Sequence, residues 1–205
     1  MNFLRSFQMV GEELFRARLN NSHSGNMSVR TNRMLAITRT GSLLHRLDYR
    51  DIVETLLEGD DAETPRASRE LPVHRAISLG TDAQSIVHAH PPHVVTLSFF
   101  TDFIQPVDAE GRFFYPSGIP VIAVTNAVGS DEVARGVTPL LKKFPVVVVR
   151  GHGSFAIGAD LDEGLHWTSS LDNVAQIILL SRIYQACPLS RSDCERFAQI
   201  QPTRN

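Results

Sequence analysis

The sequence predicts a single α/β domain whose central sheet is mixed or antiparallel and is flanked by helices. A chain of 205 residues has the size of one domain and can bury a core of its own. Short apolar runs typical of strands occur along its length, with amphipathic helical segments between some of them. These strands do not alternate strictly with helices, which disfavours a doubly wound parallel sheet. Because no repeat or linker interrupts residues 1–205, we expect one domain.

The first forty residues predict a helix followed by a β-hairpin. Apolar side chains recur at helical spacing from Phe3 and predict a helix that ends near Leu19. A cluster of turn-forming residues follows at 20–26. Two short strands are then expected at 27–30 and 34–38, with a tight turn between them.

The remainder of the chain predicts four helices and four strands around an exposed acidic stretch at 58–63. Gly80 is expected to end the first of these helices. Ser130 can cap the third, since acidic residues follow it in the first turn. The expected helices cover 69–79, a segment opened by Pro91-Pro92, 130–142 and 162–184, and the expected strands cover 85–90, 120–125, 146–150 and 154–157.

Composition argues against several classes of protein. The formal net charge is −2 and no basic stripe occurs, so we expect no nucleic-acid partner. No apolar run approaches eighteen residues and the N-terminus lacks a signal-peptide pattern, so we expect no membrane association. Cys187 and Cys194 are the two cysteines and form no disulfide framework. A cytoplasmic protein is therefore expected.

Three histidines form the strongest candidate site. In Val87-His88-Ala89-His90-Pro91 the two imidazoles share one face of a strand, roughly 6–7 Å apart along the chain. His152 lies between two glycines directly after a β-branched run, where it can project from the end of the sheet. Three neutral imidazoles with an open position are typical of catalytic zinc, although Mn²⁺, Co²⁺ or Fe²⁺ would also suit them. We interpret the remaining histidines outside the 69–79 helix as ordinary surface or core residues, namely His23, His45, His93 and His166.

Glu70 is the candidate proton-transfer group. A carboxylate beside a divalent ion can act as a fourth ligand at rest and can carry a proton when substrate binds. The alternative is a helix N-terminal carboxylate stabilised by the helix dipole. His74 would share its helix face with Glu70, and we expect it to pack or to orient the site rather than bind metal.

Three separate loops carry small hydrogen-bond donors suited to an anion. They are Gly25-Asn26, Thr40-Gly41-Ser42 and Ser68-Arg69, to which Arg30 and Arg39 can add charge. Each loop alone is also consistent with an ordinary turn. Together with the histidines, they predict a binding site for a phosphorylated small molecule.

These motifs together resemble the class II aldolase/adducin family, typified by L-fuculose-1-phosphate aldolase. The motifs that carry the resemblance occur in family order between Phe3 and Tyr184, as Gly-Asn-x-Ser, Thr-x-Thr-Gly, Ser-x-Glu, His-Ala-His-Pro and Gly-His-Gly. The resemblance implies a three-layer domain with zinc on His88, His90 and His152 and with Glu70 as catalytic acid/base. It also implies a cyclic homotetramer with active sites between subunits.

The resemblance further assigns the substrate phosphate to Asn26, Thr40, Gly41 and Ser68. Arg69 stands where the aldolases often have a second serine, and we place it in the same pocket, reshaped or holding a different acid group. The family's catalytic tyrosine comes from a neighbouring subunit. Tyr115 is our candidate for it and Tyr184 a weaker one, with a packing role as the alternative for Tyr115.

The expected activity is cleavage of a phosphorylated ketose, such as L-fuculose 1-phosphate, into dihydroxyacetone phosphate and an aldehyde. A sugar-phosphate epimerase, dehydratase or decarboxylase on the same scaffold is an alternative. Epimerases of this kind typically carry aspartate at the position of Glu70, which disfavours that option. A non-catalytic, adducin-like binding module is the alternative from a different class of protein.

Overall fold

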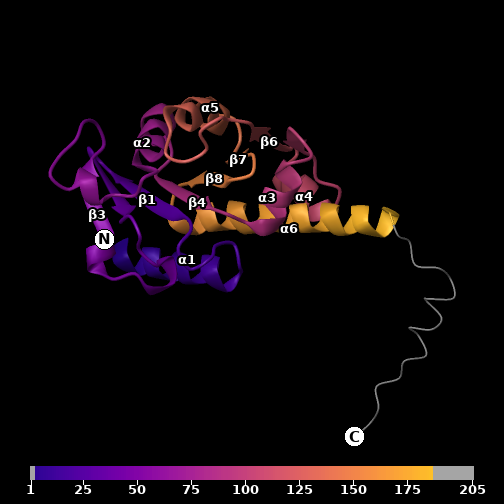
Figure 1. The fold of residues 1–205 in the computed structure, drawn as a ribbon, viewed down its shortest axis with the longest axis horizontal. Coiled ribbons are helices and arrows are strands. Elements are labelled where there is room, and N and C mark those ends of the chain that lie inside the picture. The colour runs from indigo at the N-terminus through magenta and orange to yellow at the C-terminus, as the bar shows by residue number, and fades with distance from the viewer. Residues whose placement is uncertain (1–2, 187–205) are drawn as a thin grey trace, which may run out of the picture.

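The fold is a computed structural model that describes residues 3–186, with helices on both faces of one sheet (Figure 1). The eight strands lie in the order β3-β2-β1-β4-β8-β7-β6-β5. Every neighbouring pair is antiparallel except β6 and β7, which are parallel. The predicted mixed sheet is therefore confirmed. The strands are β1 (Asn26–Thr31), β2 (Met34–Thr38), β3 (Ile52–Leu56), β4 (Ser85–Ala89), β5 (Phe103–Ile104), β6 (Ile119–Ile122), β7 (Val146–Val149) and β8 (Gly153–Gly158).

Two groups of helices cover opposite faces of the sheet (Figure 1). On one face α2 and α5 pack together over β4, β7 and β8. On the other face lie α1, α3 and the long α6. The helices are α1 (Phe3–Arg16), α2 (Leu71–Gly80), α3 (Pro92–Ser98), α4 (Ala109–Phe114), α5 (Asp131–Leu141) and α6 (Leu161–Ala186).

The sheet is apolar on both sides where it lies between these helices. Ile86 of β4 contributes to the core beneath α2 and α5, whereas the adjacent Val87 contributes to the core beneath α1. All four valines of β7 are fully buried. A strand covered on both faces has no alternation of polar and apolar residues, which explains the unbroken run at 146–149.

Several boundaries differ from the expectation. Helix α1 ends at Arg16 rather than near Leu19, and Arg18 adopts a left-handed backbone with φ of 59°. Strand β6 ends at Ile122 because the next loop binds Glu132, whose carboxylate accepts hydrogen bonds from the backbone N–H of Thr125 and Asn126. The pair Cys187 and Cys194 lies outside the described residues.

Three short elements were not predicted, namely β3, α4 and β5. Strand β3 is half exposed and contains Glu54, α4 has six residues, and β5 has two. Helix α4 and strand β5 carry too few residues to show a periodicity.

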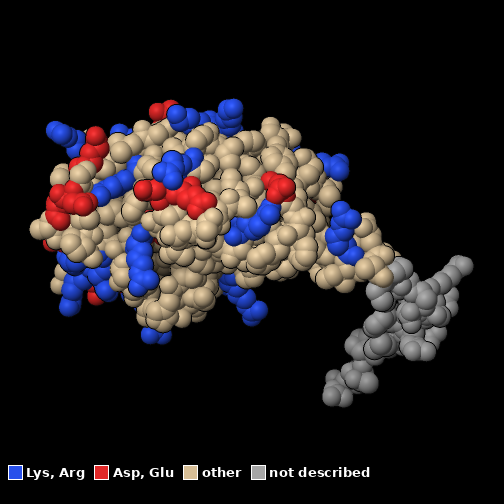
Figure 2. Space-filling view, turned by 45° about the horizontal axis from the view of Figure 1, so that its top comes forward, with Lys and Arg blue, Asp and Glu red and all other residues tan. Residues whose placement is uncertain are grey.

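Two observations concern the expectations about nucleic acid and membranes, namely the distribution of surface charge and the apolar character of the helices. Lysine and arginine side chains are interspersed with acidic ones on the face that Figure 2 shows. Within residues 3–186, no helix is long and apolar enough to cross a bilayer.

Candidate metal centre and active site

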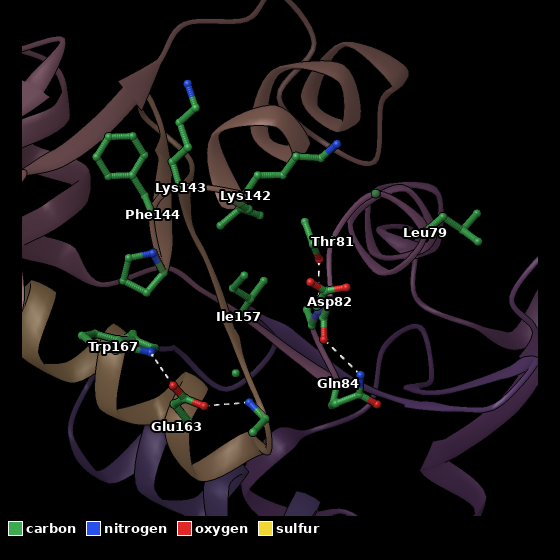
Figure 3. Close-up of a pocket in the computed structure, with 16 residues that line it drawn as sticks. Leu79, Thr81, Asp82, Gln84, Lys142, Lys143, Phe144, Ile157, Glu163 and Trp167 are labelled. Atoms are coloured by element: carbon green, nitrogen blue, oxygen red, sulfur yellow. Dashed lines mark hydrogen bonds between the residues drawn. The ribbon is translucent and has the colours of Figure 1, made fainter.

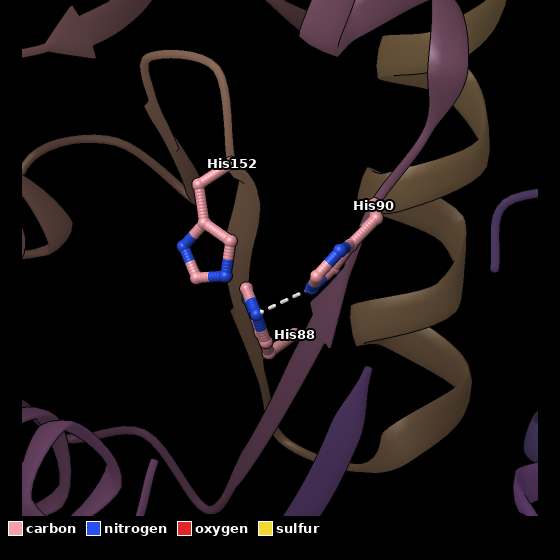
Figure 4. Close-up of side chains that lie close together, drawn as sticks. All are labelled: His88, His90 and His152. Carbon is pink, nitrogen blue, oxygen red and sulfur yellow. Dashed lines mark hydrogen bonds between the residues drawn. The ribbon is translucent and has the colours of Figure 1, made fainter. Parts of the chain in front are cut away.

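The three predicted histidines meet at one end of the sheet (Figure 4). His88 lies in β4, His90 directly follows that strand, and His152 lies in the turn between β7 and β8. Each pair of rings has a centroid separation of 4.8 Å, and the Nε2 atoms of His88 and His90 are 3.0 Å apart. One nitrogen from each ring lies within 4.8 Å of the others, so a single ion can be bound by all three.

The surroundings orient His88 as a ligand. Its Nδ1 donates to the backbone carbonyl of Ser154 at 2.9 Å, which leaves the lone pair of Nε2 facing the other two rings. Phe155 stacks on the imidazole with a centroid distance of 4.2 Å. Such outer contacts fix the tautomer and ring orientation that metal binding needs.

Burial keeps the three imidazoles neutral. Removal from water, followed by electrostatic repulsion from the neighbouring His90 and His152 rings, holds the pKa of His88 well below its usual value. The same causes lower the pKa of His90 to about 4, and burial lowers that of His152. Nδ1 of His152 is buried without a hydrogen-bond partner among the described residues. Neutral rings with an unsatisfied buried nitrogen fit a divalent metal, since protons do not compete for the ligand atoms.

Glu70 lies beside this cluster, as predicted. It precedes α2, it is 4 % exposed, and one carboxylate oxygen is 3.9 Å from Nε2 of His152. Burial raises the pKa of Glu70 to about 7, against a smaller lowering effect of the backbone N–H of Gly129. The other carboxylate oxygen has no partner among the described residues. A carboxyl group that titrates near neutrality can both accept and return a proton.

Asn26 is held toward the site by His74. Nε2 of His74 lies 2.6 Å from Oδ1 of Asn26, and Nδ1 lies 2.7 Å from the hydroxyl of Ser28. His74 is fully buried and its pKa is lowered to about 3 by that burial. Its bond to Asn26 fits the orienting role expected of it. Because β1 pairs with β4, Asn26 also lies directly opposite His88 in the sheet.

A cavity of about 400 Å³ brings the predicted loops and the histidines together. The hydroxyl of Thr40 donates to the carbonyl of Ala67 at 2.8 Å, which ties the two loops to one another. The hydroxyl of Ser68 accepts a bond from the backbone N–H of Glu70 at 3.2 Å. The predicted site residues that line this cavity are Asn26, Thr40, Gly41, Ser68, Arg69, Glu70, His88, His90 and His152.

The two accessory arginines are bound elsewhere. Arg39 lines the cavity but pairs with Asp51 at 2.6 Å, and Arg30 donates to the carbonyl of Ser78 at 2.6 Å. Arg39 is therefore held by a carboxylate, and Arg30 does not line the cavity.

Several residues at the cavity were not predicted as site residues, among them His23, Ser24, Val128 and Asn20. His23 lines the cavity from the turn before β1, and Asn20 accepts a bond from the backbone N–H of His90 at 2.9 Å. Asn20 belongs to the cluster of turn formers, whose composition is the only sequence signal for it.

The structure does not bring Tyr115 to this site. Tyr115 is 2 % exposed in the core beneath α6, and its hydroxyl lies 2.6 Å from the carbonyl of Trp167 and 2.7 Å from the hydroxyl of Ser170. Burial raises its pKa above the usual value. A side chain enclosed in this way cannot reach a neighbouring subunit, so the structure favours the packing role. Tyr184 is 58 % exposed on α6 and does not line the cavity.

A larger hollow of about 780 Å³ lies at the opposite end of the strands, near the start of β4 and β7 (Figure 3). Several of its polar groups are paired with the protein. Glu163 binds the indole N–H of Trp167 at 3.3 Å and the backbone N–H of Ala159 at 2.7 Å, and Gln84 donates to the carbonyl of Asp82. The chemistry-bearing side chains instead converge on the histidine end.

The fold and site together define an α/β domain with a three-histidine cluster that could hold a metal ion, an adjacent carboxyl group and donor-rich loops. The family model of the Class II Aldolase and Adducin N-terminal domain matches residues 6–179. The chain therefore belongs to the class II aldolase and adducin family.

Solved structures and curated relatives support this assignment. The L-fuculose-1-phosphate aldolase of Thermus thermophilus is 34% identical, with a TM-score of 0.86 over 91% of this chain and 97% of that one. The L-fuculose phosphate aldolase of Escherichia coli is 29% identical over 82% of this chain and 78% of its own length. The 3,4-dihydroxyphthalate decarboxylase of Arthrobacter keyseri is 29% identical over 72% of this chain. This match spans 60% of the length of the Arthrobacter keyseri enzyme. The match to the 3,4-dihydroxyphthalate decarboxylase of Rhodococcus jostii spans 48% of the length of that enzyme.

Proposed function

We propose that this protein is a zinc-dependent class II aldolase that cleaves a phosphorylated ketose, such as L-fuculose 1-phosphate, into dihydroxyacetone phosphate and an aldehyde. One observation carries the proposal. The three neutral histidines and the near-neutral carboxyl group of Glu70 line the same cavity as the donor-rich loops. The likeness of this chain to L-fuculose phosphate aldolases, at 34% and 29% identity, supports the substrate class.

The three histidines and Glu70 have different roles in the proposed reaction. Zinc bound by His88, His90 and His152 would polarise the ketose carbonyl as a Lewis acid. Glu70, beside His152, returns a proton to the carbon released by C–C cleavage and removes it in the reverse direction. The near-neutral pKa of this carboxyl group suits both directions.

We assign the binding of the substrate phosphate to uncharged hydrogen-bond donors. Asn26, Thr40, Gly41 and Ser68 supply amide, hydroxyl and backbone N–H groups on one side of the cavity. Hydrogen bonds from fixed donors of this kind hold a phosphate and set the position of the reacting carbons. His74 contributes indirectly because it holds Asn26.

We also propose that the chain assembles as a homotetramer in the cytoplasm, with the site completed by a neighbouring subunit. Phe100 and Phe113 are 78% and 79% exposed, and exposed apolar side chains of this size are typical of contact surfaces. The proton donor to the aldehyde oxygen would then come from the neighbour. Light scattering on the purified protein measures the assembly directly.

The central experiment measures aldehyde release from a panel of phosphorylated ketoses by zinc-loaded protein. Cleavage of at least one member is expected, and Glu70→Gln should lower kcat by about 100-fold or more, the scale of general acid–base catalysis. Glu54→Gln, which changes an exposed glutamate of β3, is the matched control. Full cleavage by Glu70→Gln in a metal-replete preparation would overturn the assignment.

Decarboxylation is the second candidate, favoured by the likeness to 3,4-dihydroxyphthalate decarboxylases at 29% identity. Both reactions break a carbon–carbon bond and leave negative charge on a carbon next to a polarised carbonyl. Release of CO₂ without an aldehyde, from substrates bearing a carboxylate beside that carbon, would identify the decarboxylase.

A further inference from the structure

Helix α3 connects two of the three histidines of the candidate metal centre. It begins two residues after His90, so the chain runs from this histidine directly into the helix. At the other end of α3, the buried hydroxyl of Ser98 accepts a hydrogen bond from the backbone N–H of Gly151 at 2.9 Å. Gly151 immediately precedes His152. The position of α3 therefore affects the distance between His90 and His152.

The turn that carries His152 also packs closely against the end of α3. Gly151 has a left-handed backbone with φ of 68°, and a Cβ atom there would lie 2.9 Å from the ring of Phe99, the residue after α3. The turn thus contacts this end of the helix through both a hydrogen bond and a packing contact. A displacement of α3 would consequently be transmitted to His152.

Asp172 of α6 holds the other end of α3. Its carboxylate accepts a hydrogen bond from the backbone N–H of His93 at 3.2 Å and another from Nδ1 of the same residue at 2.8 Å. His93 is the second residue of α3 and lies three positions after His90. A carboxylate that binds the backbone and the side chain of one residue fixes both the position and the orientation of this end of the helix.

Asp172 lies on the buried face of α6, among apolar residues. It is 9 % exposed, and Leu171, Val174 and Ala175 belong to the apolar core. Because burial of a carboxylate is costly, a buried pair of this kind contributes little net stability. It does provide a directed contact, since both hydrogen bonds form only when α3 has one orientation on α6. An apolar residue at position 172 would pack against its surroundings without setting that orientation.

We propose that Asp172 is a positioning residue of the metal centre, which acts through α3 to set the distance between His90 and His152. The inference rests on metal binding by the three histidines, which is part of the proposed function, and it does not depend on which bond the enzyme breaks. A metal site needs its ligands within about 0.5 Å of the productive geometry. His88 is held within β4, whereas His90 and His152 lie beyond the ends of strands and need support from other elements.

The first test compares the zinc affinity of Asp172→Ala with that of Glu163→Ala. Glu163 is a matched control because it also lies on α6 and accepts one backbone N–H and one ring N–H, from Ala159 and Trp167, at the opposite end of the strands. Competition with a chelator should show the Kd for zinc raised about tenfold or more in Asp172→Ala, as is typical when outer contacts of metal ligands are removed. The Kd of Glu163→Ala should stay within about threefold of wild type.

The second test uses the absorption spectrum of cobalt-loaded protein, which reports ligand geometry without turnover. The d–d bands of Asp172→Ala should differ from wild type in position or intensity, whereas those of Glu163→Ala should match wild type. Asp172→Asn keeps one oxygen for the backbone N–H of His93 and should be intermediate in both tests. This conservative variant replaces Asp172→Ala if the latter does not fold, and circular dichroism checks the folding of each variant.

The possible outcomes separate this proposal from the proposed function. Lower stability of Asp172→Ala in urea, with unchanged zinc affinity and cobalt spectrum, would show a purely structural role and overturn the proposal, as would an equal loss of affinity in Glu163→Ala. Failure of wild-type protein to bind either metal would overturn both this proposal and the metal-dependent function. Weaker zinc binding by Asp172→Ala, in a protein that releases aldehyde from no phosphorylated ketose, would refute the aldolase function and retain the role of Asp172.

Discussion

Replacement of Glu70 by glutamine should stabilise the metal-free protein at alkaline pH. Glu70 is 4 % exposed, and burial raises its pKa from 4.5 to about 7 in the folded state. A carboxyl group with a raised folded pKa contributes stability that is fully present below pH 4.5 and is lost as the pH rises through about 7. That loss amounts to about 3 kcal/mol, since one pKa unit corresponds to about 1.4 kcal/mol. Glutamine stays neutral at every pH, so the variant does not lose this stability as the pH rises.

Urea unfolding in the presence of a chelator measures this effect at about pH 5 and about pH 8. The stability of Glu70→Gln relative to wild type should increase by about 2–3 kcal/mol between the two pH values. Protonation of the buried histidines at the lower pH destabilises both proteins alike and so cancels in the difference to first order. Glu54→Gln, at an exposed position, should show no such increase. Parallel pH profiles for wild type and Glu70→Gln would refute the inference that burial destabilises the ionised carboxylate.

Three further substitutions test other parts of the structure. His88→Ala should reduce bound zinc from about one ion per chain to well below half of that, as measured by elemental analysis after dialysis. His74→Phe leaves the carbonyl of Asn26 without its partner and should cost about 1–3 kcal/mol of stability in urea unfolding while raising KM for the phosphorylated substrate. Tyr115→Phe removes the bond to Trp167 and should cost about 1 kcal/mol in stability, with kcat unchanged; a large loss of kcat would restore a catalytic role for this tyrosine.

The order of secondary structure could largely be predicted from local pattern. Ser130 caps α5 as expected, with its hydroxyl accepting from the backbone N–H of Val133 at 3.1 Å. The hairpin of β1 and β2 also forms where turn residues separate two apolar runs. Strand β3 was not predicted because its strand conformation depends on pairing with β2 rather than on its own sequence pattern.

The candidate ligands could be predicted because their spacing is local. His88 and His90 share a strand face whatever the rest of the fold does, and the glycines beside His152 mark a turn after a buried strand. The role of Tyr115 could not be predicted in the same way. Its place beneath α6 depends on contacts with Trp167 and Ser170, more than fifty residues away in sequence.

The sequence by itself determined the residue types of this site: three imidazoles, a carboxyl group and small donors. The imidazoles were expected at strand ends, the small donors in loops and Glu70 at the start of a helix. Tertiary structure alone decided their environment. Strand order brings β4 beside β8, so that His88 meets His152, and burial lowers the histidine pKa values and raises that of Glu70. The tertiary structure also pairs Arg39 with Asp51, whereas it leaves Arg69 without a side-chain partner among residues 3–186. Desolvation and pairing depend on long-range packing, which no local pattern encodes.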